Sequence, residues 1–127
     1  MEFTIKATFN TTTEALFKAW LDSDSHTAMT GGAAEASDQT GAAFTSWDGY
    51  IEGKNIELVL YQRIVQSWRA AEFEASHEDS ILTLHFEPEG DQTELTLTHS
   101  NLPDSIGEQY RQGWLDHYFT PMQAYFT

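Results

Sequence analysis

The sequence contains no cysteine, and this absence removes several kinds of chemistry together. Disulfides, thiolate catalysis and cysteine-based zinc sites are excluded. The absence also agrees with a reducing compartment, so we expect a cytoplasmic protein. No apolar run approaches the roughly 18 residues of a membrane span. Residues 1–6 lack the basic and apolar regions of a secretion signal, so we expect neither a leader nor a membrane anchor.

Basic side chains are scarce: six Lys and Arg oppose twenty Asp and Glu, which gives a formal net charge of −14. A surface with this acidic excess repels a polyanion and has few basic contacts with which to release counterions. We therefore expect neither nucleic acid nor an anionic membrane as a partner.

The residues that are abundant are those of a folded core. Hydrophobic residues make up 40% and aromatic residues 13% of a chain of 127 residues. This length is typical of a single domain, here 1–127, that folds without a metal or a disulfide.

The first 30 residues predict one strand and two short helices. Apolar and polar residues alternate over 2–9, as in a half-buried strand. Thr11 and Glu14 have the spacing of a capping box, so a short helix should follow. A second short helix is expected from Asp24 to Met29.

Turn signals about every ten residues then predict an antiparallel meander. Its strands are expected at 33–37, 41–47, 50–60, 63–73, 80–87 and 92–99. Together with the first strand they make a seven-stranded sheet.

A long amphipathic helix is predicted over 103–126, where large apolar residues recur every three or four positions. Pro121 lacks the amide that would bond to the carbonyl of His117, so an irregular turn is expected near 117–121. The element order predicts an α+β fold in which a curved antiparallel sheet of seven strands wraps around this helix.

Four segments of the chain, in this order and at this spacing, resemble the family of activators of heat-shock protein 90 ATPase homologues. The segments are Met29–Leu58, Arg63–Arg69, Leu95–Pro103 and Tyr110–Phe126. The chain is similar to the C-terminal domain of those activators, and the resemblance implies the helix-grip fold of the START and Bet v superfamily. It also implies a chaperone of the heat-shock protein 90 type as a partner.

Two histidines are candidates for polar groups in a cavity. His99 ends a strand whose Leu95 and Leu97 face inward; alternatively, it caps the turn that follows. His117 lies on the inner stripe of the last helix beside Trp114; alternatively, it is a hydrogen-bonded core residue. No two histidines have the spacing of metal ligands, so we expect no metal and no cofactor.

Arg69 is a candidate for binding an acidic ligand. If the chain turns at residues 61–62, Arg69 shares a face with Leu58 and Val65 and points into the fold. A guanidinium in that position needs an acid partner. The alternative is a salt bridge to one of the chain's own acidic side chains.

The last hairpin has a similar register prediction. With its turn centred on residues 89–90, Leu84 lies opposite Leu95 and Leu82 lies opposite Leu97 on the apolar face.

Any ligand site should lie between the middle of the last helix and the sheet. The expected lining residues are Tyr110, Trp114, His117 and Tyr118 from the helix and Arg69, Leu84, Leu97 and His99 from the sheet. The alternative is that the aromatic members are simple core. Because acidic residues are so numerous, a neutral or weakly acidic ligand is expected.

Catalytic motifs are lacking. The sequence has no nucleophile elbow, phosphate-binding loop or dinucleotide-binding glycine pattern. We therefore expect a non-enzymatic domain that binds either a chaperone or a small hydrophobic molecule, such as a lipid or polyketide-like compound. A cyclase- or hydrolase-like enzyme is the third alternative.

Overall fold

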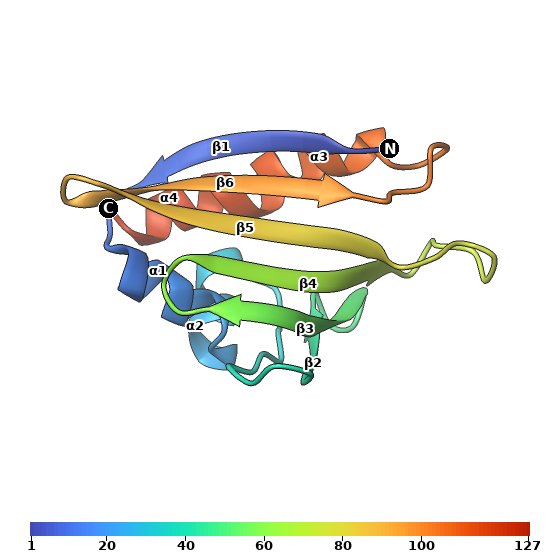
Figure 1. The fold of residues 1–127 in the computed structure, drawn as a ribbon, viewed down its shortest axis with the longest axis horizontal. Coiled ribbons are helices and arrows are strands. Elements are labelled where there is room, and N and C mark those ends of the chain that lie inside the picture. The colour runs from blue at the N-terminus through green and yellow to red at the C-terminus, as the bar shows by residue number, and fades with distance from the viewer.

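A computed structural model describes the whole chain, Met1–Thr127. Six antiparallel strands form one sheet in the order β1-β6-β5-β4-β3-β2, and all of the helices lie on one side of it (Figure 1). The strands are β1 (Phe3–Phe9), β2 (Ala43–Ser46), β3 (Ile51–Val59), β4 (Arg63–Ala70), β5 (Ser80–Glu89) and β6 (Gln92–Ser100).

Two short helices, α1 (Thr13–Trp20) and α2 (Ser23–Thr30), follow β1. Thr12 caps α1 by accepting a hydrogen bond from the Ala15 amide at 3.1 Å, and Asp22 caps α2. Gly31 ends α2 in a left-handed conformation (φ 85°), which a glycine adopts without steric cost.

The predicted strand at 33–37 is wrong, and the sheet has six strands instead of seven. This segment makes only an isolated bridge, between Glu35 and Thr45. Hydroxyl groups of α2 bind its amides instead: Ala34 donates to Thr27 at 3.0 Å and Ala36 donates to Ser23 at 2.9 Å. These bonds attach the segment to α2 on the side that faces away from β2, and the segment does not continue into a ladder.

The C-terminal helical segment begins five residues later than predicted. It consists of α3 (Glu108–Trp114), a π-helical turn η1 (Leu115–Phe119) and α4 (Thr120–Tyr125). In the π-turn the Thr120 amide donates to the carbonyl of Leu115. The irregular turn that was predicted before Pro121 is therefore confirmed. None of the helices is long and apolar enough to cross a bilayer.

Both predicted hairpin registers are wrong, with different consequences. In the last hairpin Leu84 pairs with Leu97, not Leu95, because Gly90 (φ 62°) occupies the first position of the two-residue turn and not the second. This shift of two residues keeps every side chain on its predicted face. Between β3 and β4, Leu58 pairs with Ile64 and not with Val65, across a three-residue turn. This shift of one residue turns the side chains of β4 that were predicted to face inward, among them Arg69, to the outer face of the sheet.

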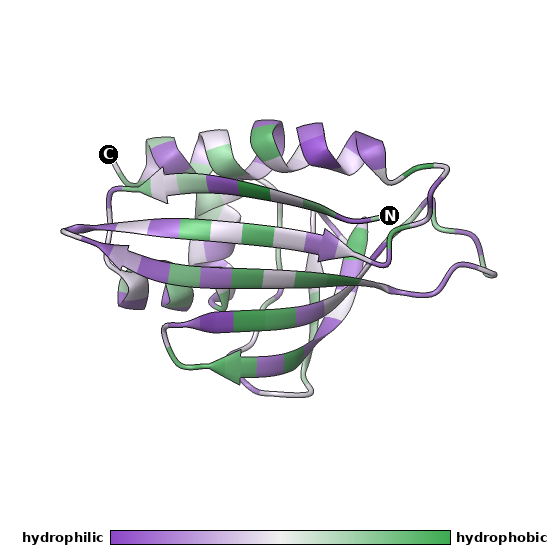
Figure 2. Ribbon diagram, turned by 45° about the horizontal axis from the view of Figure 1, so that its top comes forward, coloured by the Kyte–Doolittle hydropathy of each residue, from purple (hydrophilic) through white to green (hydrophobic).

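The core lies between the sheet and the helices. Inward and outward residues alternate along the long strands, as the striped colouring of Figure 2 shows. On β4 the buried residues include Ile64 and Trp68, and on β5 they include Leu84. The helical segment covers them with Trp114 and other buried side chains, and these residues belong to one hydrophobic cluster.

Two glycines in contrasting surroundings test this packing. A Cβ added to Gly53 would lie 1.8 Å from the backbone oxygen of Ser67, whereas one added to Gly113 would meet nothing within 4 Å. We predict that Gly53→Ala lowers the free energy of unfolding by about 2 kcal/mol or more. Gly113→Ala should raise it by about 0.5–1 kcal/mol, because glycine weakens a helix interior.

Urea denaturation measures both glycine variants. A loss of stability in Gly113→Ala as large as that in Gly53→Ala would contradict the open space beside α3.

Candidate ligand-binding cleft

A cleft of about 490 Å³ opens between the helical segment, the turn that joins β2 to β3, and the end of β4. Most of its lining is aromatic. The aromatic side chains are Trp47, Tyr50, Trp68, Tyr110, Trp114 and Tyr118. A cleft of this volume and composition is typical of small-molecule sites, which lie at roughly 300–1,000 Å³.

The aromatic rings come from three parts of the fold and contact one another. The ring centroids of Trp114 and Tyr118 lie 4.4 Å apart in a tilted arrangement. Trp68, from β4, meets Tyr110 edge to face at 5.0 Å. Trp47, from the β2–β3 turn, contacts Tyr118 at 6.2 Å. Such mutual contacts hold each ring in one orientation.

Gly113 helps to leave the cleft open. It lies on α3 between lining residues, and a Cβ at this position would project into open space. The lack of a side chain therefore adds room to the cleft.

The polar rim of the cleft is centred on Glu72. Its Oε1 accepts hydrogen bonds from the hydroxyl groups of Tyr50 and Tyr110, the latter at 2.6 Å, and from the amide of Gln109 at 3.0 Å. Tyr50 lies just before β3, whereas Gln109 and Tyr110 lie on α3. Three donors from two parts of the fold thus converge on one carboxylate oxygen.

These hydrogen bonds decide the protonation states of the rim. Partial burial opposes the charge on Glu72, but the bonds from Tyr110 and Tyr50 hold its pKa below the ordinary value of 4.5. Burial, together with the bond to Glu72, raises the pKa of Tyr50 to about 12 and that of Tyr110 further. At neutral pH the rim therefore carries one carboxylate and two neutral phenols.

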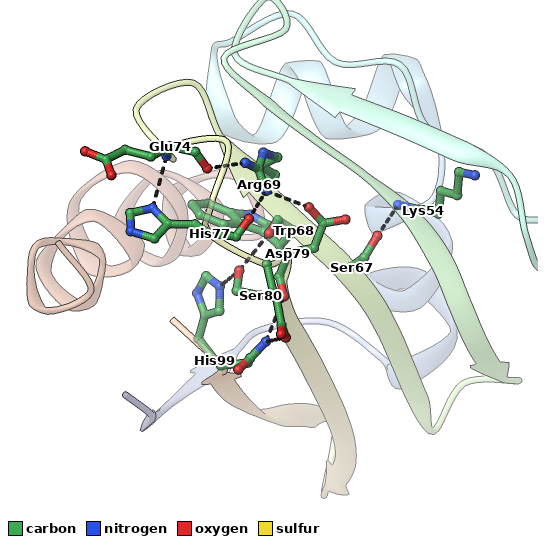
Figure 3. Close-up of polar contacts among 11 residues, drawn as sticks. Lys54, Ser67, Trp68, Arg69, Glu74, His77, Asp79, Ser80 and His99 are labelled. Carbon is green, nitrogen blue, oxygen red and sulfur yellow. Dashed lines mark hydrogen bonds and ion pairs between the residues drawn. The ribbon is translucent and has the colours of Figure 1, made fainter. Parts of the chain in front are cut away.

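Beneath the cleft, His99 joins the helical segment to three strands. It is fully buried, and its Nδ1 accepts from the indole N–H of Trp114 at 3.0 Å. Its Nε2 lies 2.8 Å from the hydroxyl of Ser80, which itself donates to the carbonyl of Trp68 at 2.7 Å (Figure 3). Because that hydroxyl proton is committed, His99 must donate from Nε2, and the ring is neutral.

Burial of His99 lowers its pKa to about 3. His26 on α2 is also buried, and burial likewise lowers its pKa. Both histidines are therefore neutral structural residues. The alternative role predicted for His99, capping the turn after β6, is wrong, since its bonds run to Trp114 and Ser80.

The structure divides the predicted site residues into two groups. Tyr110, Trp114, His117 and Tyr118 line the cleft. Leu84, Leu97 and His99 lie below it, each with no exposed surface, packed in the core. These three predicted lining residues of the sheet therefore face the core and not the cleft.

Arg69 was predicted to point into the fold, and this is wrong. The shift of one residue in the β3–β4 register places Arg69 on the outer face of the sheet, because its neighbours Trp68 and Ala70 take the inward positions. It forms an ion pair with Asp79 at 3.1 Å and donates to the carbonyls of Glu74 and His77 (Figure 3). The alternative, a salt bridge to an acidic neighbour, is confirmed.

His117 lies at the rim instead of on the inner stripe of the helix. It is exposed, and its ring lies 5.8 Å from that of Trp47. The π-turn explains the difference: it holds more residues per turn than an α-helix, so the buried position after Trp114 falls on Tyr118 and Phe119. The alternative of a hydrogen-bonded core histidine is also wrong.

Sequence reasoning missed Glu72, Tyr50 and Gln109 as members of one polar group. Glu72 stands two residues after β4 in a segment where acidic residues are common, so nothing in the local pattern distinguishes it. Its role depends on contacts with residues 22 and 38 positions away in the chain.

The chain contains no group of three or more His, Asp or Glu side chains that could hold a metal ion.

A curved antiparallel sheet that packs one face against a C-terminal helical segment defines a helix-grip α+β domain. The profile of the family described as "Activator of Hsp90 ATPase homolog 1-like protein" matches residues 10–127, and the chain belongs to this family.

Two known proteins illustrate the relationship. The human protein named "Activator of 90 kDa heat shock protein ATPase homolog 1" is 30% identical over 125 residues, which cover 98% of this chain but 37% of the human protein. The crystal structure of an HSP90 activator from Plasmodium falciparum superposes with a TM-score of 0.89 at 26% identity, covering 98% of this chain and 94% of that one.

A third structure, of a protein from Chromobacterium violaceum, superposes with a TM-score of 0.79 at 21% identity, covering 98% of this chain and 96% of that one. At this identity the likeness concerns the fold alone. The chain spans about a third of the length of the curated relatives that it matches.

The buried histidines predict a specific pH dependence of stability. In the unfolded chain a histidine titrates near pH 6.5, whereas folded His99 stays neutral until about pH 3. The unfolded state therefore binds more protons below pH 6.5, and stability is complete above that pH and is lost as the pH falls. We expect His99 to contribute a loss that approaches about 1.4 kcal/mol per pH unit between about pH 6 and pH 5, where most carboxylates are still ionised.

Urea denaturation at several pH values measures this slope, and His99→Gln should reduce it by that amount. Imidazole nitrogen shifts of the unmodified protein give an independent reading, because His99 should remain the Nε2–H tautomer at pH 5. A charged His99 at pH 5 would show that the network is not as described.

Proposed function

We propose that this domain binds a small, largely apolar organic molecule in the aromatic cleft. The observation that supports the proposal is a cleft of about 490 Å³ in which six of eleven lining residues are aromatic. Apolar surface of the ligand would be removed from water against these rings, and the hydrogen-bonded rim would fix its orientation.

The arrangement of the polar groups favours binding over catalysis. One oxygen of the Glu72 carboxylate accepts from Tyr50 and Tyr110, and no hydrogen bond joins the carboxylate to His117. The buried His99 has both ring nitrogens in hydrogen bonds and is out of reach of the cleft. A general base also needs a partner that orients it, and no hydrogen bond orients the imidazole of His117, the one histidine that lines the cleft.

Titration with the neutral fluorophore N-phenyl-naphthylamine, followed through its emission, tests the site. We predict saturable binding of one molecule per chain, and Gly113→Leu should weaken it by at least about tenfold, because the added side chain fills the open space beside α3.

The matched control is Gln112→Leu, on the same helix but outside the cleft, which should bind the fluorophore as the unmodified protein does. Equal binding by both folded variants would place the site elsewhere. Absence of binding to the unmodified protein would contradict the proposal.

A second candidate function is association with a chaperone of the heat-shock protein 90 type. Two observations support it: the human relative and the solved Plasmodium structure both carry the activator name, and the latter is matched over 94% of its length. The chain also has a broad groove between α1, the start of α2, the segment 36–40, the β3–β4 turn and the end of α4. Two apolar side chains that line it are exposed to solvent, Leu60 by 64% and Tyr125 by 46%.

Stimulation of ATP hydrolysis by the corresponding chaperone of the same organism tests this second function. If the groove takes part, the double variant Leu60→Ser, Tyr125→Ser should lose at least about half of the stimulation, because it removes apolar contact area. Ile56→Ser is the matched control, since Ile56 is 48% exposed but lies outside the groove. No stimulation and no binding by the unmodified protein would contradict association.

A further inference from the structure

We propose that the cleft selects an organic cation, that is, a flat or compact apolar group that carries an ammonium nitrogen. This inference rests on the proposed function of the cleft as a ligand site, and it names the chemical class of the ligand. It replaces the expectation of an acidic ligand head, which depended on Arg69 pointing inward.

The set of side chains around the cleft favours a cation, because none of the lining residues is Lys or Arg. Five of the six basic side chains lie within ion-pair distance of a carboxylate elsewhere, among them Arg69 with Asp79 and Arg111 with Glu108. The sixth, Lys54, is exposed on β3 and lies outside the cleft. A ligand anion would therefore find no lysine or arginine partner in the cleft.

The hydrogen bonds at the rim run from the two phenol hydroxyls to the carboxylate. Tyr50 and Tyr110 both donate their hydroxyl protons to Glu72, so their oxygens have only lone pairs left to offer a ligand. Gln109 likewise commits an amide N–H to the same carboxylate. The two phenol oxygens are thus acceptors, and acceptors favour a ligand that donates protons or carries positive charge.

The negative charge of Glu72 itself also favours a cation. Its hydrogen bonds favour the ionised form, and all three of them end on Oε1. None of these three donors uses the second oxygen of Glu72, Oε2, so the carboxylate keeps acceptor capacity. The acidic excess of the whole surface adds to this preference, since it raises the local concentration of cations.

The aromatic rings that line the cleft favour a cation as well. The faces of tryptophan and tyrosine are negative, and a cation within about 6 Å of a ring centroid is attracted to them, most strongly by tryptophan. Three of the lining residues are tryptophans, Trp47, Trp68 and Trp114, and three are tyrosines. An ammonium group held between such faces and a carboxylate needs no hydrogen bonds of its own, so a quaternary nitrogen is also suitable.

Three naphthalene derivatives of nearly equal size test the inference by titration calorimetry. They are naphthylmethyl-trimethylammonium, the neutral analogue in which carbon replaces the nitrogen, and the anion naphthylacetate. We expect the cation to bind about tenfold or more tightly than the neutral analogue, with the anion weakest. The affinity for the cation should fall as salt is added, while that for the neutral analogue should not.

Glu72→Gln removes the charge but keeps an oxygen that can accept from Tyr50 and Tyr110. This variant should weaken binding of the cation by about tenfold and leave the neutral analogue unchanged. Glu108→Gln is the matched control, because Glu108 precedes the lining residues on α3 but pairs with Arg111 outside the cleft.

The possible failures of the two proposals are distinguishable. Equal affinity for the cation and the neutral analogue, or tightest binding of the anion, would overturn the cation preference and leave the ligand site in place. An unchanged affinity for the cation in folded Glu72→Gln would overturn the part assigned to this carboxylate. If neither the three derivatives nor N-phenyl-naphthylamine bind, the proposed ligand site itself is contradicted.

Discussion

The domain depends on one buried chain of hydrogen bonds that runs from Trp114 through His99 and Ser80 to the backbone of Trp68. It connects α3 to β6, β5 and β4, and every donor and acceptor in it is satisfied. Leaving one buried partner unpaired would cost roughly 1–3 kcal/mol, so these hydrogen bonds fix the distance and rotation of the helical segment against the sheet. The aromatic cleft exists because this connection holds Trp114 and Trp68 in place while Gly113 leaves the space beside them open.

Much of the fold was predictable from the sequence, because it depends on local patterns. The strands predicted from alternation and turn spacing are found within a few residues of their expected bounds, apart from the segment 33–37. That segment makes a single bridge to β2, while the hydroxyls of Ser23 and Thr27 bind its amides on the other side, and such contacts with a helix leave no trace in the strand pattern. Of the residues predicted to line a ligand site, only those of the C-terminal helical segment lie at the cleft.

The remaining site predictions failed for geometric reasons. A three-residue turn in place of a two-residue turn moved Arg69 to the outer face, and a π-turn in place of an α-turn moved His117 to the rim. Each is a difference of a single residue, yet in a strand one residue exchanges the two faces, and in a helix it rotates the side chain by roughly 100°. Glu72 depends on tertiary contacts and has no local signal at all.

The π-turn also divides the C-terminal segment into two parts that contact different regions. Before it, α3 presents Tyr110, Gly113 and Trp114 to the cleft; after it, α4 packs Met122 into the core, and Gln123 donates to the backbone of Thr8 on β1. Trp114 both anchors α3 to the sheet and lines the cleft, whereas Gly113 lines it without a side chain that binds elsewhere. A change at Gly113 can therefore reshape the cleft for other ligands while the docking of α4 onto the first strand stays the same.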